Sequence, residues 1–189
     1  MEKKFAQKPG DILKVVLFGP ESTGKTTLSQ QLARHYNTVW VPEYARQYLQ
    51  DKWNNERKTC EPKDLLPIAR GQIKLENELT QKATDVLICD TDLLETKVYS
   101  EAYYVGSCDP LLEKYAIENT YDLYFLTYID VPWEKDDLRD KPDERQKMFK
   151  YFENALITYN RPYVLLKGDK KSRLHTAIRH IDKLLKEND

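Results

Sequence analysis

The segment with the clearest chemical meaning in this sequence is Gly19-Pro20-Glu21-Ser22-Thr23-Gly24-Lys25-Thr26. It fits the pattern G-x-x-x-x-G-K-[ST], in which a curled backbone points successive N–H groups at the phosphates of a nucleoside triphosphate. In this pattern Lys25 reaches the β- and γ-phosphates, and the hydroxyl of Thr26 binds Mg²⁺. The residues expected to hold the triphosphate are Gly19, Glu21, Ser22, Thr23, Gly24, Lys25, Thr26 and Thr27.

Two aspartates, Asp90 and Asp92, follow the apolar run Val86-Leu87-Ile88-Cys89. Mg²⁺ on a triphosphate needs a carboxylate near the end of a neighbouring strand, and Asp90 stands at that place. In an extended chain Asp92 would point the same way, so we expect it to orient or deprotonate an acceptor hydroxyl. The alternative for Asp92 is a purely structural role as the N-cap of the helix that begins near Leu93.

A second pair of charged residues, Glu43 and Arg46, follows the apolar run that ends at Val41. Ligands of parallel sheets bind beyond the carboxyl ends of the strands. We therefore expect Glu43 to hydrogen-bond a ribose or the acceptor hydroxyl, and Arg46 to contact phosphate. The alternative is an ordinary surface pair on a short helix.

The segment from about residue 133 to 147 is dense in charged residues of both signs. Such a segment is typical of a lid that closes over the site and brings an arginine to the transferring phosphoryl group. Arg139 is the first candidate for that arginine and Arg145 the second. A solvated loop with peripheral ion pairs is the alternative.

Short apolar runs alternate with amphipathic segments along the chain, which predicts an α/β fold with a parallel sheet. The expected strands are 15–18, 38–41, 86–89, 123–129 and 163–166, and the expected helices are 25–36, 43–50, 62–82, 93–104, a helix from Pro110, 142–159 and 172–185. Pro67 should kink or split the third helix, and Ser172 should cap the last. We predict one domain over residues 1–189, with the fold of the P-loop NTPases: a five-stranded parallel sheet flanked by helices.

The composition excludes several classes of protein. Lys and Arg total 30 and Asp and Glu 31, so the net charge of −1 argues against a general nucleic-acid binder. The sequence contains no apolar run of ~18 residues, so it predicts no membrane-spanning helix. The N-terminus lacks the apolar core of a signal peptide. Three cysteines without Cys-x-x-Cys spacing favour reduced thiols in the cytoplasm. The sequence leaves a homo-oligomer open.

Four segments in this order resemble the NadR-type ribosylnicotinamide (nicotinamide riboside) kinase family: Gly19–Thr27, Val41-Pro42-Glu43-Tyr44-Ala45-Arg46, Asp90-Thr91-Asp92 and Asp136–Arg139. The resemblance runs from about Lys14 to Leu185. It implies a P-loop kinase that transfers the γ-phosphoryl group of ATP to the 5′-hydroxyl of nicotinamide riboside, giving nicotinamide mononucleotide for NAD salvage. The catalytic residues it implies are Lys25, Asp92 and Arg139. The family domain often follows an adenylyltransferase domain; here we expect a stand-alone kinase.

One departure from the family concerns the residue before Glu43. Relatives carry a tryptophan there that stacks on the nicotinamide ring, whereas this chain has Pro42. Trp40, Tyr44 or Tyr99 would then have to stack on the ring, although Trp40 is equally well explained as a core residue.

Two other functions stay open at this point. One is a kinase of another nucleoside or small alcohol, and the other is a regulatory ATPase linked to transcriptional control. A regulator that binds DNA should show a basic face or a helix-turn-helix segment, and the sequence suggests neither.

Overall fold

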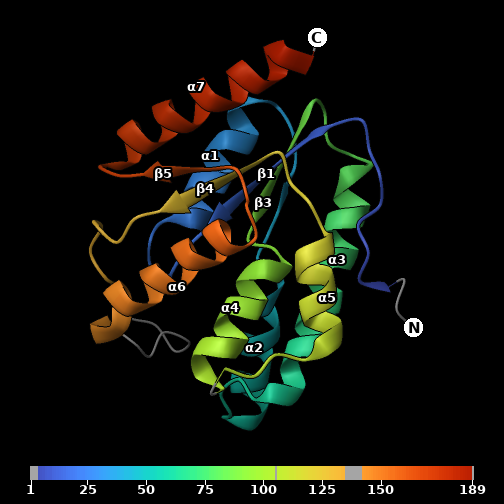
Figure 1. Ribbon diagram of the computed structural model, residues 1–189, viewed down its shortest axis with the longest axis vertical. Coiled ribbons are helices and arrows are strands. Elements are labelled where there is room, and N and C mark those ends of the chain that lie inside the picture. Colours follow the sequence, from blue (N-terminus) through green and yellow to red (C-terminus); the bar gives the residue numbers. More distant parts are fainter. Residues whose placement is uncertain (1–3, 105, 135–141, 189) are drawn as a thin grey trace.

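The computed structural model of the protein describes residues 4–104, 106–134 and 142–188, and it is built around one five-stranded sheet (Figure 1). The strands are β1 (Leu13–Phe18), β2 (Trp40–Val41), β3 (Val86–Asp90), β4 (Leu123–Thr127) and β5 (Tyr163–Leu166). Their order in the sheet is β2-β3-β1-β4-β5, and every neighbouring pair is parallel. The predicted α/β class and parallel sheet are confirmed.

Helices cover both faces of the sheet. They are α1 (Lys25–His35), α2 (Tyr44–Glu56), α3 (Leu65–Thr80), α4 (Leu93–Tyr103), α5 (Pro110–Glu118), α6 (Arg145–Thr158) and α7 (Lys170–Asn188), with short 3-10 turns at Pro62–Asp64 and Pro142–Glu144. Helices α1 and α7 bury their apolar residues on one face, and α3, α4, α5 and α6 on the other. Helix α2 lies outside, against α3 (Figure 1).

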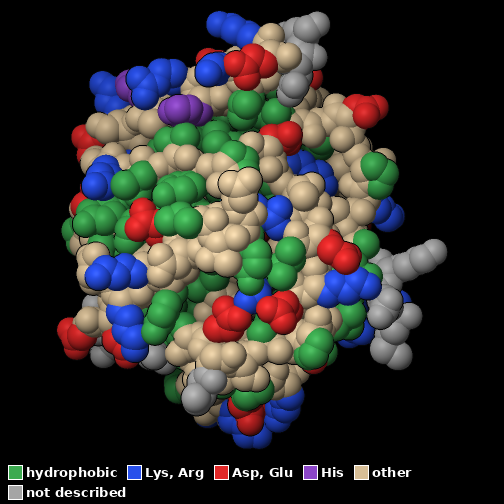
Figure 2. All heavy atoms as spheres, viewed as in Figure 1, with side chains coloured by type: hydrophobic (Ala, Val, Ile, Leu, Met, Phe, Trp, Pro, Cys, Tyr) green, Lys and Arg blue, Asp and Glu red, His purple; other side chains and the backbone are tan. Residues whose placement is uncertain are grey.

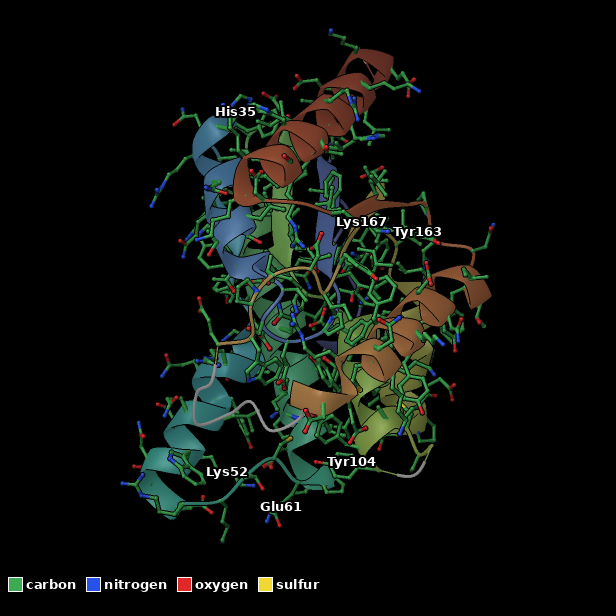
Figure 3. The ribbon with its side chains drawn as sticks, turned by 90° about the vertical axis from the view of Figure 1, so that its left-hand side faces the viewer. His35, Lys52, Glu61, Tyr104, Tyr163 and Lys167 are labelled. Carbon is green, nitrogen blue, oxygen red and sulfur yellow. The ribbon has the colours of Figure 1, made fainter. Side chains whose placement is uncertain are left out.

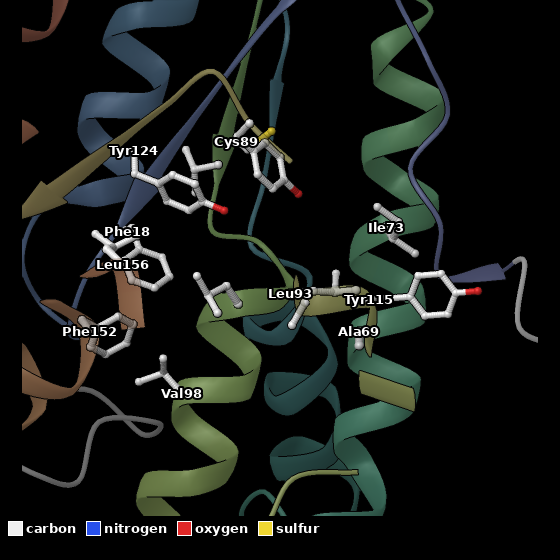
Figure 4. Packing of buried hydrophobic residues seen from close by; sticks show 14 of the residues in the cluster. Phe18, Ala69, Ile73, Cys89, Leu93, Val98, Tyr115, Tyr124, Phe152 and Leu156 are labelled. Atoms are coloured by element: carbon white, nitrogen blue, oxygen red, sulfur yellow. The ribbon is translucent and has the colours of Figure 1, made fainter. Parts of the chain in front are cut away.

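The centre of the sheet is anchored on both faces because alternate residues of β1 enter different cores. Val15 and Leu17 pack toward α1 and α7, whereas Val16 and Phe18 pack toward α3–α6. On that second side the Phe18 ring meets other aromatic rings edge-on, at 5.5 Å from Tyr124 and 4.9 Å from Phe152 between centroids (Figure 4). The strand ends that carry the polar residues therefore project from a rigid core.

The helices agree with the sequence prediction in number and order but differ in several boundaries; α2, for example, runs to Glu56 instead of ending at residue 50. Pro67 does not split α3, because it lies in the first turn of the helix, where its missing N–H would have no partner within the helix. Helix α7 begins two residues before Ser172, and the carboxylate of Asp169 accepts the Ser172 backbone N–H at 2.8 Å. Asp169 is thus the cap in place of Ser172.

The last helix shows the amphipathic pattern of a surface element. Two residues on its inner side, Ala177 and Ile181, are fully buried. Lys, Arg and His side chains gather over its outer side, at the top of the molecule in Figure 2. Across the described ranges of the chain, no helix is long and apolar enough to cross a membrane.

Candidate active site

The loop between β1 and α1 takes the shape that the motif requires. Its backbone has positive φ at Gly19 (140°), Ser22 (55°) and Gly24 (84°), which lets it curl tightly. A Cβ atom on Gly19 would lie 2.7 Å from the Oγ1 atom of Thr127, so only glycine allows this approach to β4. Residues 21–27 line a cavity, and Gly19 is not among its lining residues.

The ammonium group of Lys25 is held inside this loop. Its Nζ atom donates to the carbonyls of Gly19 at 2.6 Å and Pro20 at 3.0 Å, and lies 3.3 Å from a carboxylate oxygen of Glu95. Burial by itself lowers the pKa of Lys25, but Glu95, Glu43 and Asp90 together raise it above its ordinary value. The lysine therefore stays protonated within the loop.

Glu95 is a site residue that the sequence analysis missed. It lies in the first turn of α4, is 3% exposed, and its burial raises the pKa of its carboxyl well above the ordinary value. A glutamate three residues after an N-cap is usually part of a capping box, which hides any other role. Its position after the end of β3 was the available signal.

Thr26 and Asp90 form the oxygen pair expected for a metal. The Thr26 hydroxyl donates to Asp90 Oδ2 at 2.5 Å, while the buried Oδ1 atom has no hydrogen-bond partner among the described residues. Burial, and then the negative charge of Glu43, raise the pKa of Asp90 to about 7. The described residues contain no cluster of three or more His, Cys, Asp or Glu residues that would hold a metal alone. The pair fits Mg²⁺ that is shared with phosphate oxygens.

The side chain of Asp92 does not lie beside that of Asp90, so the expected geometry is corrected. Thr91 adopts φ 75°, which ends the extended chain and turns the next residue toward the other face of the sheet. Asp92 is 1% exposed; it caps α4 through the Glu95 backbone N–H at 2.9 Å and accepts the Tyr124 hydroxyl at 2.7 Å. Burial raises its pKa to about 6. Asp92 lines neither cavity described here, and the capping alternative matches its contacts.

Two neighbouring cavities lie beside the phosphate loop. The larger, of 640 Å³, runs from this loop to the segments that follow β4 and β5. The smaller, of 180 Å³, lies between α2, α3 and α4 and has three tyrosines, Tyr99, Tyr103 and Tyr104, in its wall. Glu21, Glu43, Leu49 and Tyr99 line both. A triphosphate in the first cavity would thus face an acceptor in the second.

Of the residues expected on the acceptor side, some line the cavities and others do not. Glu43, Arg46 and Tyr99 line the larger cavity, and Glu43 and Tyr99 also line the smaller one. Trp40 instead packs among the residues beneath α1 and α7, because the alternation along β2 points it to that face. The ring of Tyr44 lies against Gly71 of α3 and reaches neither cavity. Of the three aromatic candidates, only Tyr99 lines a cavity.

The flanks of the predicted lid are joined to the phosphate loop at Ser22. The backbone N–H of Glu134 donates to the Ser22 hydroxyl at 2.8 Å, and the guanidinium of Arg145 donates to the Ser22 carbonyl at 3.2 Å. Arg139 and the rest of the segment 135–141 lie outside the described residues. Arg139 stays a prediction from the sequence.

Arg173 is a second residue that the sequence analysis missed. This side chain of α7 is 4% exposed and donates to the backbone carbonyls of Thr23 at 2.6 Å, Tyr128 at 2.8 Å and Gly168 at 2.9 Å. It also pairs with Asp130. Arg173 thereby joins the phosphate loop to the segments after β4 and β5 that line the larger cavity. No local pattern marks it, because its partners lie far away in sequence.

Replacing Arg173 by methionine should weaken nucleotide binding. The variant removes several charge-assisted hydrogen bonds, so the Kd for ATP should rise at least about tenfold. Arg179→Met, at an exposed position of the same helix, is the matched control and should leave the Kd unchanged. Calorimetric titration of both variants measures the two Kd values. Equal affinities would show that Arg173 only stabilises the fold and does not support nucleotide binding.

An ion-pair cluster around Lys52 links α2 to the short turn before α3, at the lower end of the molecule in Figure 3. Lys52 of α2 donates to Asp64 at 2.5 Å and Glu61 at 2.7 Å, and the Tyr104 hydroxyl donates to the Cys60 carbonyl at 2.9 Å. Hydrogen bonds from Lys52 and then Lys63 lower the pKa of Glu61 to about 2. Burial alone would raise the pKa of Asp64, but the bond from Lys52 and further hydrogen bonds hold it below the ordinary value.

Lys52→Met should lower the free energy of unfolding by about 2 kcal/mol, because it leaves the buried Asp64 without its cation. Lys58→Met removes an exposed pair with Glu56 and is the control. Carboxylates with a lowered pKa stabilise the fold above about pH 4, and this stabilisation is lost as the pH falls through their folded pKa values. Denaturant unfolding should therefore show a shallower acid dependence in Lys52→Met. Equal stability losses in the two variants would contradict this account.

The family model described as "AAA domain" matches residues 14–173. The chain belongs to this family. This AAA domain is 29% identical over 150 residues, 79% of the chain, to the "Trifunctional NAD biosynthesis/regulator protein NadR" of Salmonella typhimurium strain LT2 and to that of Escherichia coli K12. It spans 36% of the length of these relatives.

Solved structures show the same fold. A crystal structure of NadR protein in complex with NR superposes with a TM-score of 0.79 at 24% identity, over 91% of this chain and 51% of that one. A deoxyadenosine kinase from M. mycoides superposes with a TM-score of 0.67 at 15% identity, over 90% of this chain and 100% of that one. The AAA domain thus has the fold of the P-loop nucleoside kinases, as predicted.

Proposed function

We propose that this chain is an ATP-dependent kinase that phosphorylates the 5′-hydroxyl of nicotinamide riboside and forms nicotinamide mononucleotide for NAD salvage. The observation that carries the proposal is the pair of cavities that meet at Glu21, Glu43, Leu49 and Tyr99. One holds the phosphate loop, and the other has an aromatic and acidic wall. The resemblance to NadR supports nicotinamide riboside as the acceptor.

In this proposal the phosphate loop and Lys25 bind the triphosphate. Thr26 and Asp90 would hold Mg²⁺, which neutralises charge on the phosphates when bound. Glu43 receives the acceptor hydroxyl and accepts its proton, while Arg46 lies where it can contact phosphate. Phosphoryl transfer depends mainly on position and charge neutralisation, and residues of the loop supply both. Residues 1–189 would act as one kinase domain.

The smaller cavity suits a cationic aromatic ring. Tyr99, Tyr103 and Tyr104 offer ring faces, and Glu21, Glu43 and Glu95 add carboxyl groups on the same wall. A positively charged ring such as nicotinamide is attracted to aromatic faces. No Lys or Arg side chain lines this cavity among the described residues, so nothing there opposes a cation. Tyr99 then stands in for the tryptophan that Pro42 replaces.

The test is the formation of ADP from ATP and Mg²⁺ across a panel of nucleosides, with nicotinamide riboside first. We expect ADP only in its presence, together with one equivalent of nicotinamide mononucleotide. Phosphorylation of uridine or deoxyadenosine alone would keep the kinase but change its substrate. ADP release that is independent of every nucleoside would contradict the kinase and favour a regulatory ATPase.

The proposal includes the cellular compartment in which the reaction takes place. ATP and free thiols are both typical of the cytoplasm, and Cys60, Cys89 and Cys108 form no disulfide. We therefore propose a cytoplasmic enzyme with a small nucleoside as its partner.

A further inference from the structure

We propose that Gln72 of α3 is a positioning residue for Glu43. Its side-chain amide fixes the backbone on both sides of Glu43 and so sets where that carboxylate lies in the cavity. This inference rests on the proposed function, in which Glu43 meets the acceptor hydroxyl.

The contacts of Gln72 span the turn that carries Glu43. Its Oε1 atom accepts the backbone N–H of Tyr44 at 2.7 Å, and its Nε2 atom donates to the carbonyl of Pro42 at 3.3 Å. The side chain is 2% exposed and lines the smaller cavity with Glu43. The amide offers a donor and an acceptor on one rigid group, whereas a carboxylate or a hydrocarbon cannot make both bonds.

The turn needs this support because the elements on either side hold it weakly. Strand β2 is two residues long and lies at the edge of the sheet. Glu43 is the N-cap of α2, yet its side chain makes no capping hydrogen bond, which leaves its carboxylate to the cavity. The N–H of Tyr44 is the first of α2 and has no partner within the helix. Gln72 supplies that partner from another helix.

A second contact between α3 and the turn adds to the first. A Cβ atom on Gly71 would lie 2.1 Å from the Tyr44 ring, so the ring rests directly on the α3 backbone. Gly71 thus contacts the ring of Tyr44, and Gln72 accepts the backbone N–H of the same residue. The position of Glu43 is thereby tied to a helix whose buried face lies in the core.

Gln72→Met tests the inference, because methionine is similar in size but makes neither bond. Exchange of the Tyr44 amide hydrogen, followed by NMR, should accelerate at least about tenfold. With nicotinamide riboside, kcat should fall about tenfold or more while the Kd for ATP changes less than about twofold. Gln72→Glu, which keeps the acceptor but not the donor, should show intermediate losses. Thr80→Val, at the far end of α3, removes another buried hydrogen bond and should change neither readout.

The double variant Glu43→Gln/Gln72→Met decides whether Gln72 acts through Glu43. It should be no slower than Glu43→Gln alone, because a positioning residue has nothing left to position. Additive losses, or unchanged exchange at Tyr44 in Gln72→Met, would overturn the inference. If the unaltered protein phosphorylates no nucleoside, the proposed function is wrong, while the exchange measurement still decides whether Gln72 fixes the turn.

Discussion

Replacing Glu43 by glutamine should lower kcat for nucleoside phosphorylation at least about 100-fold, the usual range for the loss of a positioned acid–base group. Glutamine keeps the size of the side chain but accepts no proton. The Kd for ATP should change less than about twofold, because the phosphate loop and Arg173 are intact. Single-turnover transfer, measured beside nucleotide titration, separates the two effects.

The controls for this prediction come from two other acidic residues. Glu56→Gln, at an exposed position of α2, should keep full activity. Asp92→Asn should retain activity within about tenfold, because Asp92 is occupied by the α4 cap and Tyr124 and is expected to act only by supporting α4. If Asp92→Asn lost transfer while Glu43→Gln kept it, Asp92 and not Glu43 would be the residue that accepts the proton of the substrate hydroxyl.

Lys25→Met should reduce kcat/KM for transfer about 1000-fold, since it removes a fixed positive charge from the β- and γ-phosphates. It should also lower the melting temperature, because Lys25 balances the buried carboxyl groups of Glu95 and Asp90. Steady-state kinetics and thermal unfolding measure the two effects separately.

A second substitution distinguishes the chemical role of Lys25 from its structural role. Lys25→Met/Glu95→Gln removes the carboxylate that the single variant leaves without its cation, so it should recover most of the lost stability. It should not recover activity. Recovery of transfer in the double variant would show that Lys25 serves only to neutralise Glu95.

The sequence alone determined the parts of the site that are local. The phosphate loop, Thr26 and Asp90 were predicted because their chemistry resides in one turn between a strand and a helix, or directly after a buried strand. The order of apolar runs likewise predicted the sheet, because strands buried on both faces are continuously apolar. These features depend on neighbours in sequence, and a pattern of residues records them.

Only the tertiary structure decided which of the candidate side chains reach the cavities. Thr91 turns Asp92 away from Asp90, and the alternation along β2 turns Trp40 to the far face. Spacing in sequence does not reveal either direction, because each depends on one backbone angle or on the face that another helix covers. Glu95, Arg173 and Gln72 were missed for a related reason. Their partners lie in distant segments that meet only when the sheet order β2-β3-β1-β4-β5 is formed.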